Sequence, residues 1–260
     1  PPADVFHAGP SIVAYAGSEE EADDLAEGLL QSFLDAEGVF ADDLISAERA
    51  VAEATAHAGS GPVVIADAQD NPGAGASSDT TGLLAALVGG NAQGAVLALL
   101  DDAEVAAQAH ELGVGAEFFA SLGGKSGQEG QHPFTGRFRV VTLGTGHFTF
   151  TGEMFGGVTA NLGPVAALQI LDSDADVRVV VGSTRCQCLD QAIFRHVGIE
   201  PVEQRIVAVK SSVHFRADFD AVADKILVVA APGAHPCRLD SITYENVRRG
   251  VRLGPGGPPH

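Results

Sequence analysis

Lysine is scarce in this sequence, which has only Lys125, Lys210 and Lys225 in 260 residues. Lysine and arginine together number 15, against 34 aspartates and glutamates, and the formal net charge is -19 at pH 7. A negative field of this size repels nucleic acid and anionic membranes, so neither is expected as a partner. The acid-rich composition suits a protein that stays hydrated at high salt, or a mesophile with a GC-rich genome.

Cysteine and long apolar runs are scarce as well. Cys186, Cys188 and Cys237 are too few and odd in number for a disulfide scaffold, and they favour a reducing, cytoplasmic location. Cys186 and Cys188 lack the second ligand pair of a structural zinc site, so free thiols are expected. No apolar run reaches the roughly 18 residues that span a bilayer. The first residues have no signal-peptide pattern and no initiator methionine, so we expect part of a longer product.

The apolar pattern predicts an α/β fold with a mixed, largely parallel sheet flanked by helices. The first unit is a strand over 11–16, followed by a helix that begins with a capping box of Ser18 and Glu21. Apolar strand signals then alternate with helical patterns, which implies parallel pairing with right-handed crossovers.

Around residues 136–171 the pattern changes to short strands separated by glycines, which predicts an antiparallel subregion. Two of these strands, 138–143 and 147–151, flank a Gly-Thr-Gly sequence and are expected to form a hairpin.

The first candidate site is the segment 67–81, where a strand ends, a glycine-rich loop follows and a helix opens with Asp79 as the expected N-cap. Ligands collect at the carboxyl ends of parallel strands, and glycines let backbone N–H groups approach them. Three carboxylates make a poor phosphate cradle, so the loop suits a cationic or metal-bound group, or hydrogen-bond donors on a polar substrate. A plain turn with a capped helix is the alternative. The predicted substrate-binding residues are Asp70, Asn71, Gly73, Gly75, Asp79, Thr80 and Thr81.

The second candidate site follows a later strand and contains Lys210, Ser211, His214 and Arg216. Arg216 could hold a carboxylate through paired hydrogen bonds, and Lys210 could act as a point charge. His214 could transfer protons or bind a metal. Ion pairing with Asp218 and its neighbours is the alternative.

A third segment, 183–190, also follows a strand and places Arg185 and Gln187 on the rim. Because all three segments follow apolar strands, we expect them at the same edge of the sheet, with Asp70 and His214 on one side. The sequence contains no His-Glu-x-x-His motif, so its spacing alone assembles no metal site.

Several blocks of the sequence resemble MlrC-like (microcystin-degradation) proteins, in the order in which that family has them. The blocks are DNPGAGASSDTTGLL, GTGHFTFTGEMFGGVTANLGPVAAL, VVVGSTRCQCLDQAIFRHVGIEP, VKSSVHFRADFDAVADKILVVAAPG and ITYENVRRGVRL. Residues 61–260 thus resemble the family's C-terminal domain. Residues 1–60 resemble the end of its N-terminal region and are expected to pack on the rest. The sequence departs from the pattern at Ala74 and at Ser77-Ser78, where the family usually has Gly, Pro and Gly.

The resemblance implies a zinc-dependent metallopeptidase, a hydrolase that cleaves peptide or amide bonds in small or linear peptides. The family includes the enzyme that cleaves linearised microcystin. Its metal ligands lie mainly in the N-terminal region, so zinc is expected there and no metal ligand in this chain. The expected partners are a small peptide or amide substrate and the N-terminal region of the same polypeptide, and a homo-oligomer is compatible with the sequence.

In the intact enzyme, His214 is the predicted catalytic residue, as a hydrogen-bond donor to the oxyanion. Lys210 and Arg216 would neutralise substrate carboxylates, and Asp70 and Asn71 would hold the peptide amine or backbone. The chain alone is expected to be inactive. The alternative is a non-catalytic α/β module that binds a small anionic ligand through Lys210, His214 and Arg216. An upstream region rich in His, Asp and Glu would favour the peptidase.

Overall fold

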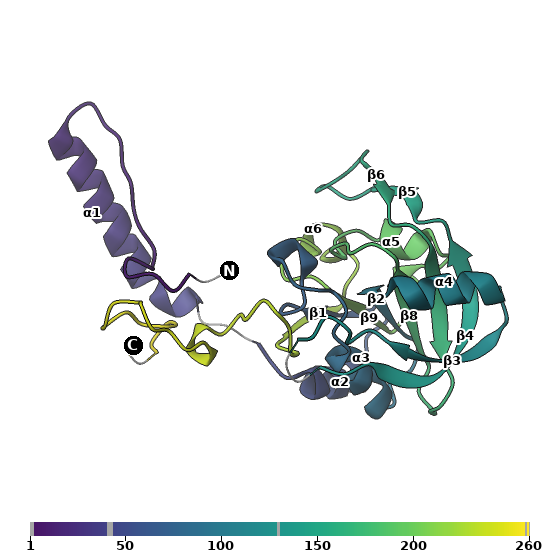
Figure 1. Cartoon of the computed structure of the whole chain (residues 1–260). Coiled ribbons are helices and arrows are strands. Elements are labelled where there is room, and N and C mark those ends of the chain that lie inside the picture. The colour runs from purple at the N-terminus through teal and green to yellow at the C-terminus, as the bar shows by residue number, and fades with distance from the viewer. Residues whose placement is uncertain (1–2, 41–43, 129–130, 258, 260) are drawn as a thin grey trace. The chain divides into compact units, whose positions relative to one another are not determined.

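The computed structural model describes residues 3–40, 44–128, 131–257 and 259. The chain divides into two compact units (Figure 1). Unit 1 consists of Pro1–Asp43 with Pro236–His260, and unit 2 consists of Leu44–His235. The family boundary expected near residue 60 stays a prediction. No helix in these described ranges is long and apolar enough to cross a bilayer.

Unit 2 is built on an eight-stranded sheet in the order β10-β1-β9-β2-β8-β7-β4-β3. The pairs from β10 through β8 are parallel, and the pairs β8–β7, β7–β4 and β4–β3 are antiparallel. The predicted mixed, largely parallel sheet is therefore confirmed, with its antiparallel part extended by β3. The strands are β1 (Val63–Asp67), β2 (Ala95–Asp101), β3 (Glu117–Leu122), β4 (Phe134–Gly144), β7 (Val165–Ile170), β8 (Val177–Gly182), β9 (Ile206–Val209) and β10 (Lys225–Val229).

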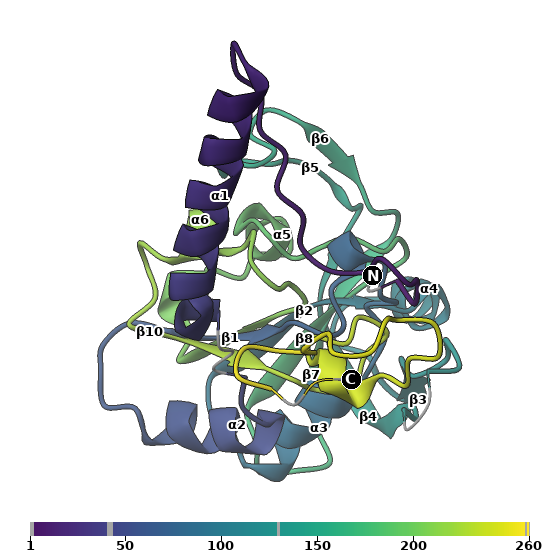
Figure 2. The same cartoon turned by 90° about the vertical axis from the view of Figure 1, so that its left-hand side faces the viewer.

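Helices cover both faces of this sheet. Val63 and Ile65 of β1 pack into one hydrophobic core with α2, α3 and α4, whereas Val64 and Ala66 pack into a second core with α5 and α6. Because both faces are buried, the central strands are continuous apolar runs. Figure 2 shows α2 and α3 next to each other on one side of the sheet. The helices are α2 (Ala47–Ala56), α3 (Gly82–Gly89), α4 (Ala103–Leu112), α5 (Ala192–Arg195) and α6 (Arg216–Phe219), with short 3₁₀ turns η2 (Pro72–Ala74) and η3 (Pro201–Glu203).

The predicted hairpin between 138–143 and 147–151 is wrong. β4 pairs with β3 and β7, whereas β5 (His147–Thr149) pairs with β6 (Thr159–Asn161) in a separate two-stranded sheet. Gly146 lies at a left-handed φ of 72°, and a Cβ there would overlap the carbonyl oxygen of Gly163. The glycine-rich stretch therefore redirects the chain between two sheets and does not close a turn within one.

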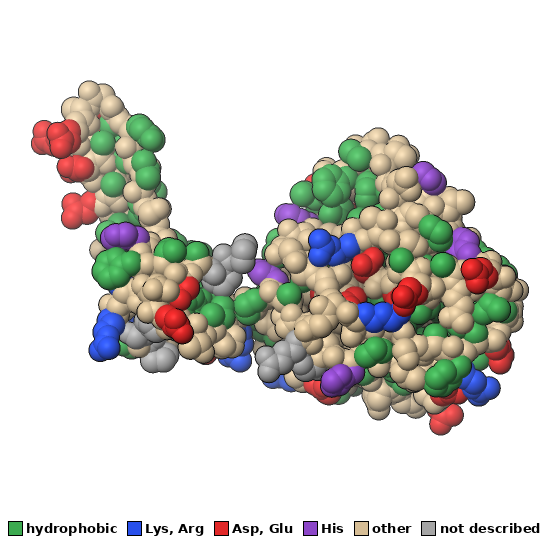
Figure 3. Space-filling view, in the orientation of Figure 1, with side chains coloured by type: hydrophobic (Ala, Val, Ile, Leu, Met, Phe, Trp, Pro, Cys, Tyr) green, Lys and Arg blue, Asp and Glu red, His purple; other side chains and the backbone are tan. Residues whose placement is uncertain are grey.

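Unit 1 contains α1 (Glu19–Asp35) and the 3₁₀ turns η1 (Glu37–Phe40) and η4 (Leu239–Ser241). The predicted helix start is confirmed, because the Ser18 side chain accepts a hydrogen bond from the Glu21 N–H at 3.3 Å. No residue of α1 is buried. Figure 3 shows hydrophobic side chains along one edge of this helix and carboxylates along the other. The strand predicted over 11–16 is not formed, since this segment has no strand partner among the described residues.

Candidate functional site

The three segments that the sequence placed at one edge of the sheet meet there. We call the carboxyl ends of β1, β2, β8 and β9, together with the segments that follow them, the carboxyl edge. Asn71, after β1, donates from Nδ2 to Ser212 Oγ, after β9, at 2.7 Å. Gln187, after β8, donates from Nε2 to Ser211 Oγ at 2.9 Å. The prediction of a shared edge is therefore confirmed.

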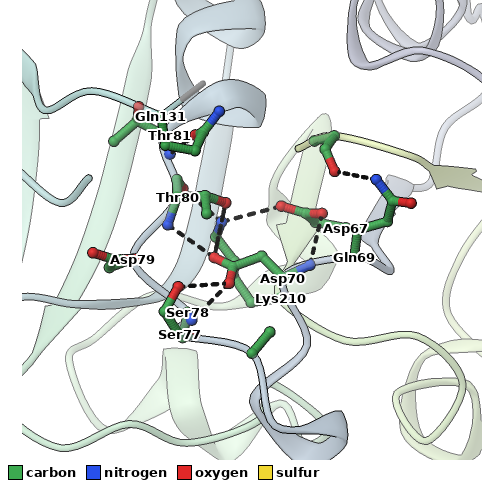
Figure 4. A network of polar contacts seen from close by, with 12 residues as sticks. Asp67, Gln69, Asp70, Ser77, Ser78, Asp79, Thr80, Thr81, Gln131 and Lys210 are labelled. Atoms are coloured by element: carbon green, nitrogen blue, oxygen red, sulfur yellow. Dashed lines mark hydrogen bonds and ion pairs between the residues drawn. The ribbon is translucent and has the colours of Figure 1, made fainter. Parts of the chain in front are cut away.

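A buried ionic cluster lies beneath this edge (Figure 4). The Lys210 ammonium donates to Asp67 Oδ2 at 3.1 Å, to Asp70 Oδ2 at 2.8 Å and to the Thr80 carbonyl oxygen at 2.6 Å. All four residues are 0% exposed. Burial disfavours the charged ammonium, but Asp67 and Asp70 outweigh this effect and raise the pKa of Lys210. Burial also raises the pKa of Asp67, more than Lys210 lowers it.

Asp70 holds the glycine-rich loop in shape. Its carboxylate accepts hydrogen bonds from Ser77 Oγ at 3.1 Å, from Ser78 N at 2.8 Å and from Thr80 N at 2.9 Å. Ser78 adopts a left-handed φ of 63°, at the position where the family resemblance predicted glycine. The Ser78 hydroxyl donates to the Leu99 carbonyl at 2.8 Å, which offsets part of the cost of that conformation.

Asp70, Thr80 and Lys210 thus contact one another and not solvent. Their geometry favours a supporting role for the carboxyl edge over the direct substrate contact that the sequence suggested. This network could not be read from local spacing, because Lys210 lies 140 residues from Asp70.

The Asp79 and Thr81 side chains also make internal bonds. The predicted N-cap role of Asp79 is wrong: α3 begins at Gly82, after Thr81, and the Asp79 carboxylate accepts from the backbone N–H groups of Lys125 and Ser126, both at 2.8 Å. Burial favours the neutral acid, but hydrogen bonds from Ser77, Ser126 and Lys125 outweigh it and lower the pKa of Asp79. The predicted site residues that are exposed are Gly73, Gly75, Arg185, His214 and Arg216.

His214 is the exposed imidazole of the carboxyl edge. Its Nδ1 lies 3.3 Å from Oε1 of Gln187, which is itself buried. An amide oxygen only accepts, so this contact assigns the proton to Nδ1. In the neutral ring Nε2 is then an acceptor, and in the imidazolium it becomes a second donor. His214 can therefore serve as a base or, when protonated, as a donor to an anion.

Arg216 is an exposed cation two residues after His214 in the sequence. Its guanidinium lies 3.5 Å from Asp220 and 5.6 Å from the centroid of the Phe215 ring. Asp220 is a neighbour of Asp218, so the ion pairing named as the alternative does form for Arg216. Asp218 itself accepts from Gln191 N at 2.6 Å. A surface ion pair such as Arg216–Asp220 contributes about 0–1 kcal/mol, so it leaves Arg216 free to exchange partners.

A cleft of about 370 Å³ lies beside the loop and contains residues that the sequence analysis missed. Arg185 lines it and donates to the Ala76 carbonyl at 3.1 Å. Burial raises the pKa of Asp101 in this cleft, against the influence of Arg185. The available signal was that Asp101 ends β2, another strand that terminates at this edge, and that Asp102 directly follows it as the N-cap of α4. The lining residues are Ser77, Asp79, Asp101, Asp102, Ala103, Glu104, Lys125, Ser126 and Arg185.

The side chains that the structure describes do not assemble a catalytic metal site. Within the described residues, no group of three or more His, Cys, Asp or Glu side chains is placed to hold a metal ion. A catalytic zinc needs about three such ligands and an open position. Burial raises the pKa of the Cys186 thiol to about 11 and that of the Cys188 thiol well above its usual value, so neither forms a thiolate readily at neutral pH.

Gly73→Ala is expected to displace Gln187 and so to change the surroundings of His214. A Cβ on Gly73 would overlap Gln187 Oε1, so the Gln187 side chain would have to move and weaken its hydrogen bond to Ser211, at a cost of about 1 kcal/mol. We expect altered imidazole NMR signals from His214 with no larger loss of stability. Gly28→Ala is the control, because a Cβ at Gly28 meets no atom within 4 Å. Unchanged His214 signals in Gly73→Ala would contradict the contact.

Known proteins are similar to this chain in sequence and in fold. Microcystinase C of Sphingomonas sp. is 31% identical over 170 residues, which cover 65% of this chain and 32% of that protein. This chain therefore spans about a third of the length of that curated relative. The crystal structure of a candidate metallopeptidase from Mesorhizobium sp. BNC1 matches with a TM-score of 0.73 at 22% identity, covering 87% of this chain and 44% of that one, which shows a shared fold. The family model described as MlrC C-terminus matches residues 65–246. The chain therefore belongs to the MlrC C-terminus family.

Proposed function

We propose that this chain is the C-terminal, substrate-cleft part of a zinc-dependent peptidase that hydrolyses small or linear peptides. The observation that carries this proposal is the family match over residues 65–246. The names of the relatives, a microcystinase and a candidate metallopeptidase, support hydrolysis of a peptide or amide bond. The chain spans only 32% and 44% of these relatives. Zinc would be held by the N-terminal region of the same polypeptide, since no suitable ligand set is found in the described residues here.

The carboxyl edge would supply hydrogen bonding and charge to the substrate. Bound zinc supplies Lewis acidity and an activated water in enzymes of this kind. Within this chain, protonated His214 would donate from Nε2 to the oxygen that gains negative charge, while Nδ1 donates to Gln187. The Gln187–Ser211 bond fixes Gln187 and thereby the orientation of the ring.

Arg216 would bind a carboxylate of the peptide. It is exposed, and its Asp220 partner can be displaced because the pair is solvated. The ion cluster of Asp67, Asp70 and Lys210 would keep the loop and the segment after β9 in register beneath the substrate. Asn71 bridges the same two segments above the cluster through Ser212.

Arg216→Ala in the full-length polypeptide is expected to raise KM about tenfold with kcat little changed. The reason is that Arg216 would bind the carboxylate equally in the ground state and the transition state. Steady-state kinetics on short linear peptides with free carboxyl termini test this. Arg195→Ala is the matched control, because it removes an exposed arginine whose partner is Glu200 at 2.8 Å. A KM unchanged in Arg216→Ala, or raised equally in both variants, would sink the assignment.

The second candidate function is a non-catalytic module that binds a small anion. The observation in its favour is that His214 and Arg216, two residues apart in the sequence, are both exposed in a chain whose described residues hold no metal-ligand set. Incubating the full-length polypeptide with linear peptides separates the two functions. Hydrolysis that a chelator abolishes and zinc restores supports the peptidase, whereas binding without hydrolysis supports the module.

A cytoplasmic location remains the expectation from the cysteine content.

A further inference from the structure

The apolar face of α1 is only partly covered by the described residues of unit 1. Leu25, Leu29, Leu30, Phe33 and Leu34 are between 41% and 54% exposed. These positions recur at helical spacing and form one continuous stripe. An open stripe of this length on a soluble protein marks a contact surface.

The segment before α1 has the pattern of an interior strand. The side chains of residues 11–16 alternate in exposure, as in a strand: Ile12 and Ala14 are half-buried, whereas Val13 and Tyr15 are 69% and 89% exposed. Apolar side chains on both faces are typical of a strand that is covered on both sides of a sheet. The backbone of this segment makes no backbone–backbone hydrogen bond to any described residue. It therefore presents the unpaired N–H and C=O groups of an open strand edge.

An apolar groove joins these two features. It has a volume of about 650 Å³ and is mostly apolar, with two carboxylates, Asp23 and Glu27, at its wall. The segment before α1 contributes Pro10, Ser11 and Ile12, and α1 contributes Asp23, Ala26, Glu27, Leu30, Phe33 and Leu34. The segment and the helix thus already lie against each other as a strand–helix pair, with one side of the pair uncovered.

We infer that residues 11–16 and α1 are a strand–helix unit of a second α/β sheet, whose other strands come from the N-terminal region of the same polypeptide. That region would pair with the backbone of 11–16 and cover Val13, Tyr15 and the stripe on α1. The relatives are long enough to contain such a region, since this chain spans 32% and 44% of them. The structural match covers 87% of this chain, which is more than unit 2 alone, so it extends into unit 1.

Charge disfavours a second copy of this chain as the occupant. α1 carries carboxylates, among them Glu19, Glu20, Asp23, Asp24 and Glu27, and two of these, Asp23 and Glu27, line the groove. Residues 1–43 contain no lysine or arginine. Pairing two such helices would bring like charges together without a compensating cation. A different region that offers apolar side chains and a strand edge meets no such repulsion.

Hydrogen exchange measured by mass spectrometry tests this inference on the full-length polypeptide and on the 260-residue chain. We expect the amides of 11–16 to exchange at least about a hundredfold more slowly in the full-length form, because strand pairing protects them. Amides of β2 should be equally protected in both and serve as the internal reference. Equal exchange of 11–16 in the two forms would overturn the inference. So would protection in the 260-residue chain that rises with its concentration, because a second copy would then be the occupant.

A pair of variants in the full-length polypeptide identifies the surface. Leu30→Asp places a charge in the groove and should speed exchange of 11–16 at least tenfold. Gln31→Asp adds the same charge at the neighbouring exposed position, and exchange should stay as in the wild type. Equal exchange in the two variants would overturn the groove as the contact.

The inference rests on the proposed function only in placing this chain within a longer polypeptide. Exchange does not report on hydrolysis, so a protected strand in a protein without peptidase activity would sink the function and leave the inference standing.

Discussion

Lys210→Met is expected to lower the free energy of unfolding by about 3–5 kcal/mol, because removing one partner of a buried ion pair leaves uncompensated charge in the interior. In this chain two carboxylates, Asp67 and Asp70, would remain buried without their shared cation. The Thr80 carbonyl would also lose its donor at 2.6 Å. Denaturant unfolding followed by circular dichroism measures the loss.

Lys225→Met is the matched control for this experiment. Lys225 pairs with Glu53 at 2.8 Å, but its side chain is 42% exposed. We expect a loss of about 0–1 kcal/mol there. Equal losses in the two variants, or a loss below about 1 kcal/mol in Lys210→Met, would show that the cluster does not hold the loop in place.

The loss in Lys210→Met should shrink as the pH falls. Burial already raises the pKa of Asp67 in the wild-type protein, and removing the cation would raise it further. A carboxyl whose folded-state pKa is raised is most stabilising when protonated, and this contribution is lost as the pH rises through the folded-state pKa. Unfolding curves at a series of acidic to neutral pH values should therefore show the variant approaching the wild type toward the acidic end.

His214→Ala in the full-length polypeptide is expected to lower kcat by about a hundredfold, the usual effect of removing one preorganised donor to an oxyanion. KM and metal content should change little, because the proposed contact forms only as charge develops on the substrate. Steady-state kinetics on a linear peptide with metal analysis of the same sample measure all three quantities. His147→Ala, at an exposed position of β5, is the control. A wild-type kcat in His214→Ala would remove this residue from the catalytic list.

The fold of unit 2 was largely predictable because its strands are apolar on both faces and alternate with amphipathic helices. The shared edge of the three segments followed from the same pattern, since parallel strands end together. The hairpin failed because spacing does not reveal that Gly146 turns the chain out of the main sheet. The strand over 11–16 is a different failure, since a strand forms only when another strand pairs with it, and its pattern alone cannot supply one.

The chemistry of the site was less predictable than its location. The scarcity of lysine marked Lys210 as unusual. It did not predict that the Lys210 side chain would point inward to Asp67 and Asp70. Local sequence is silent on such a contact, because the partners lie 143 and 140 residues away. Both exposed side chains lie beyond the end of β9. His214 is in the short turn segment after Lys210, and Arg216 is the first residue of α6.

The central claim is that this chain provides the substrate side of an active centre whose metal is held elsewhere in the same polypeptide. Metal analysis of three purified samples tests it most directly: the full-length polypeptide, its His214→Ala variant and the 260-residue chain. We expect about one zinc per polypeptide in the first two samples and none retained by the third, in keeping with the three or so ligands that a catalytic zinc needs. Stoichiometric zinc in the 260-residue chain would contradict the placement of the metal outside this chain. Loss of zinc from full-length His214→Ala would contradict it as well and would make His214 a metal ligand.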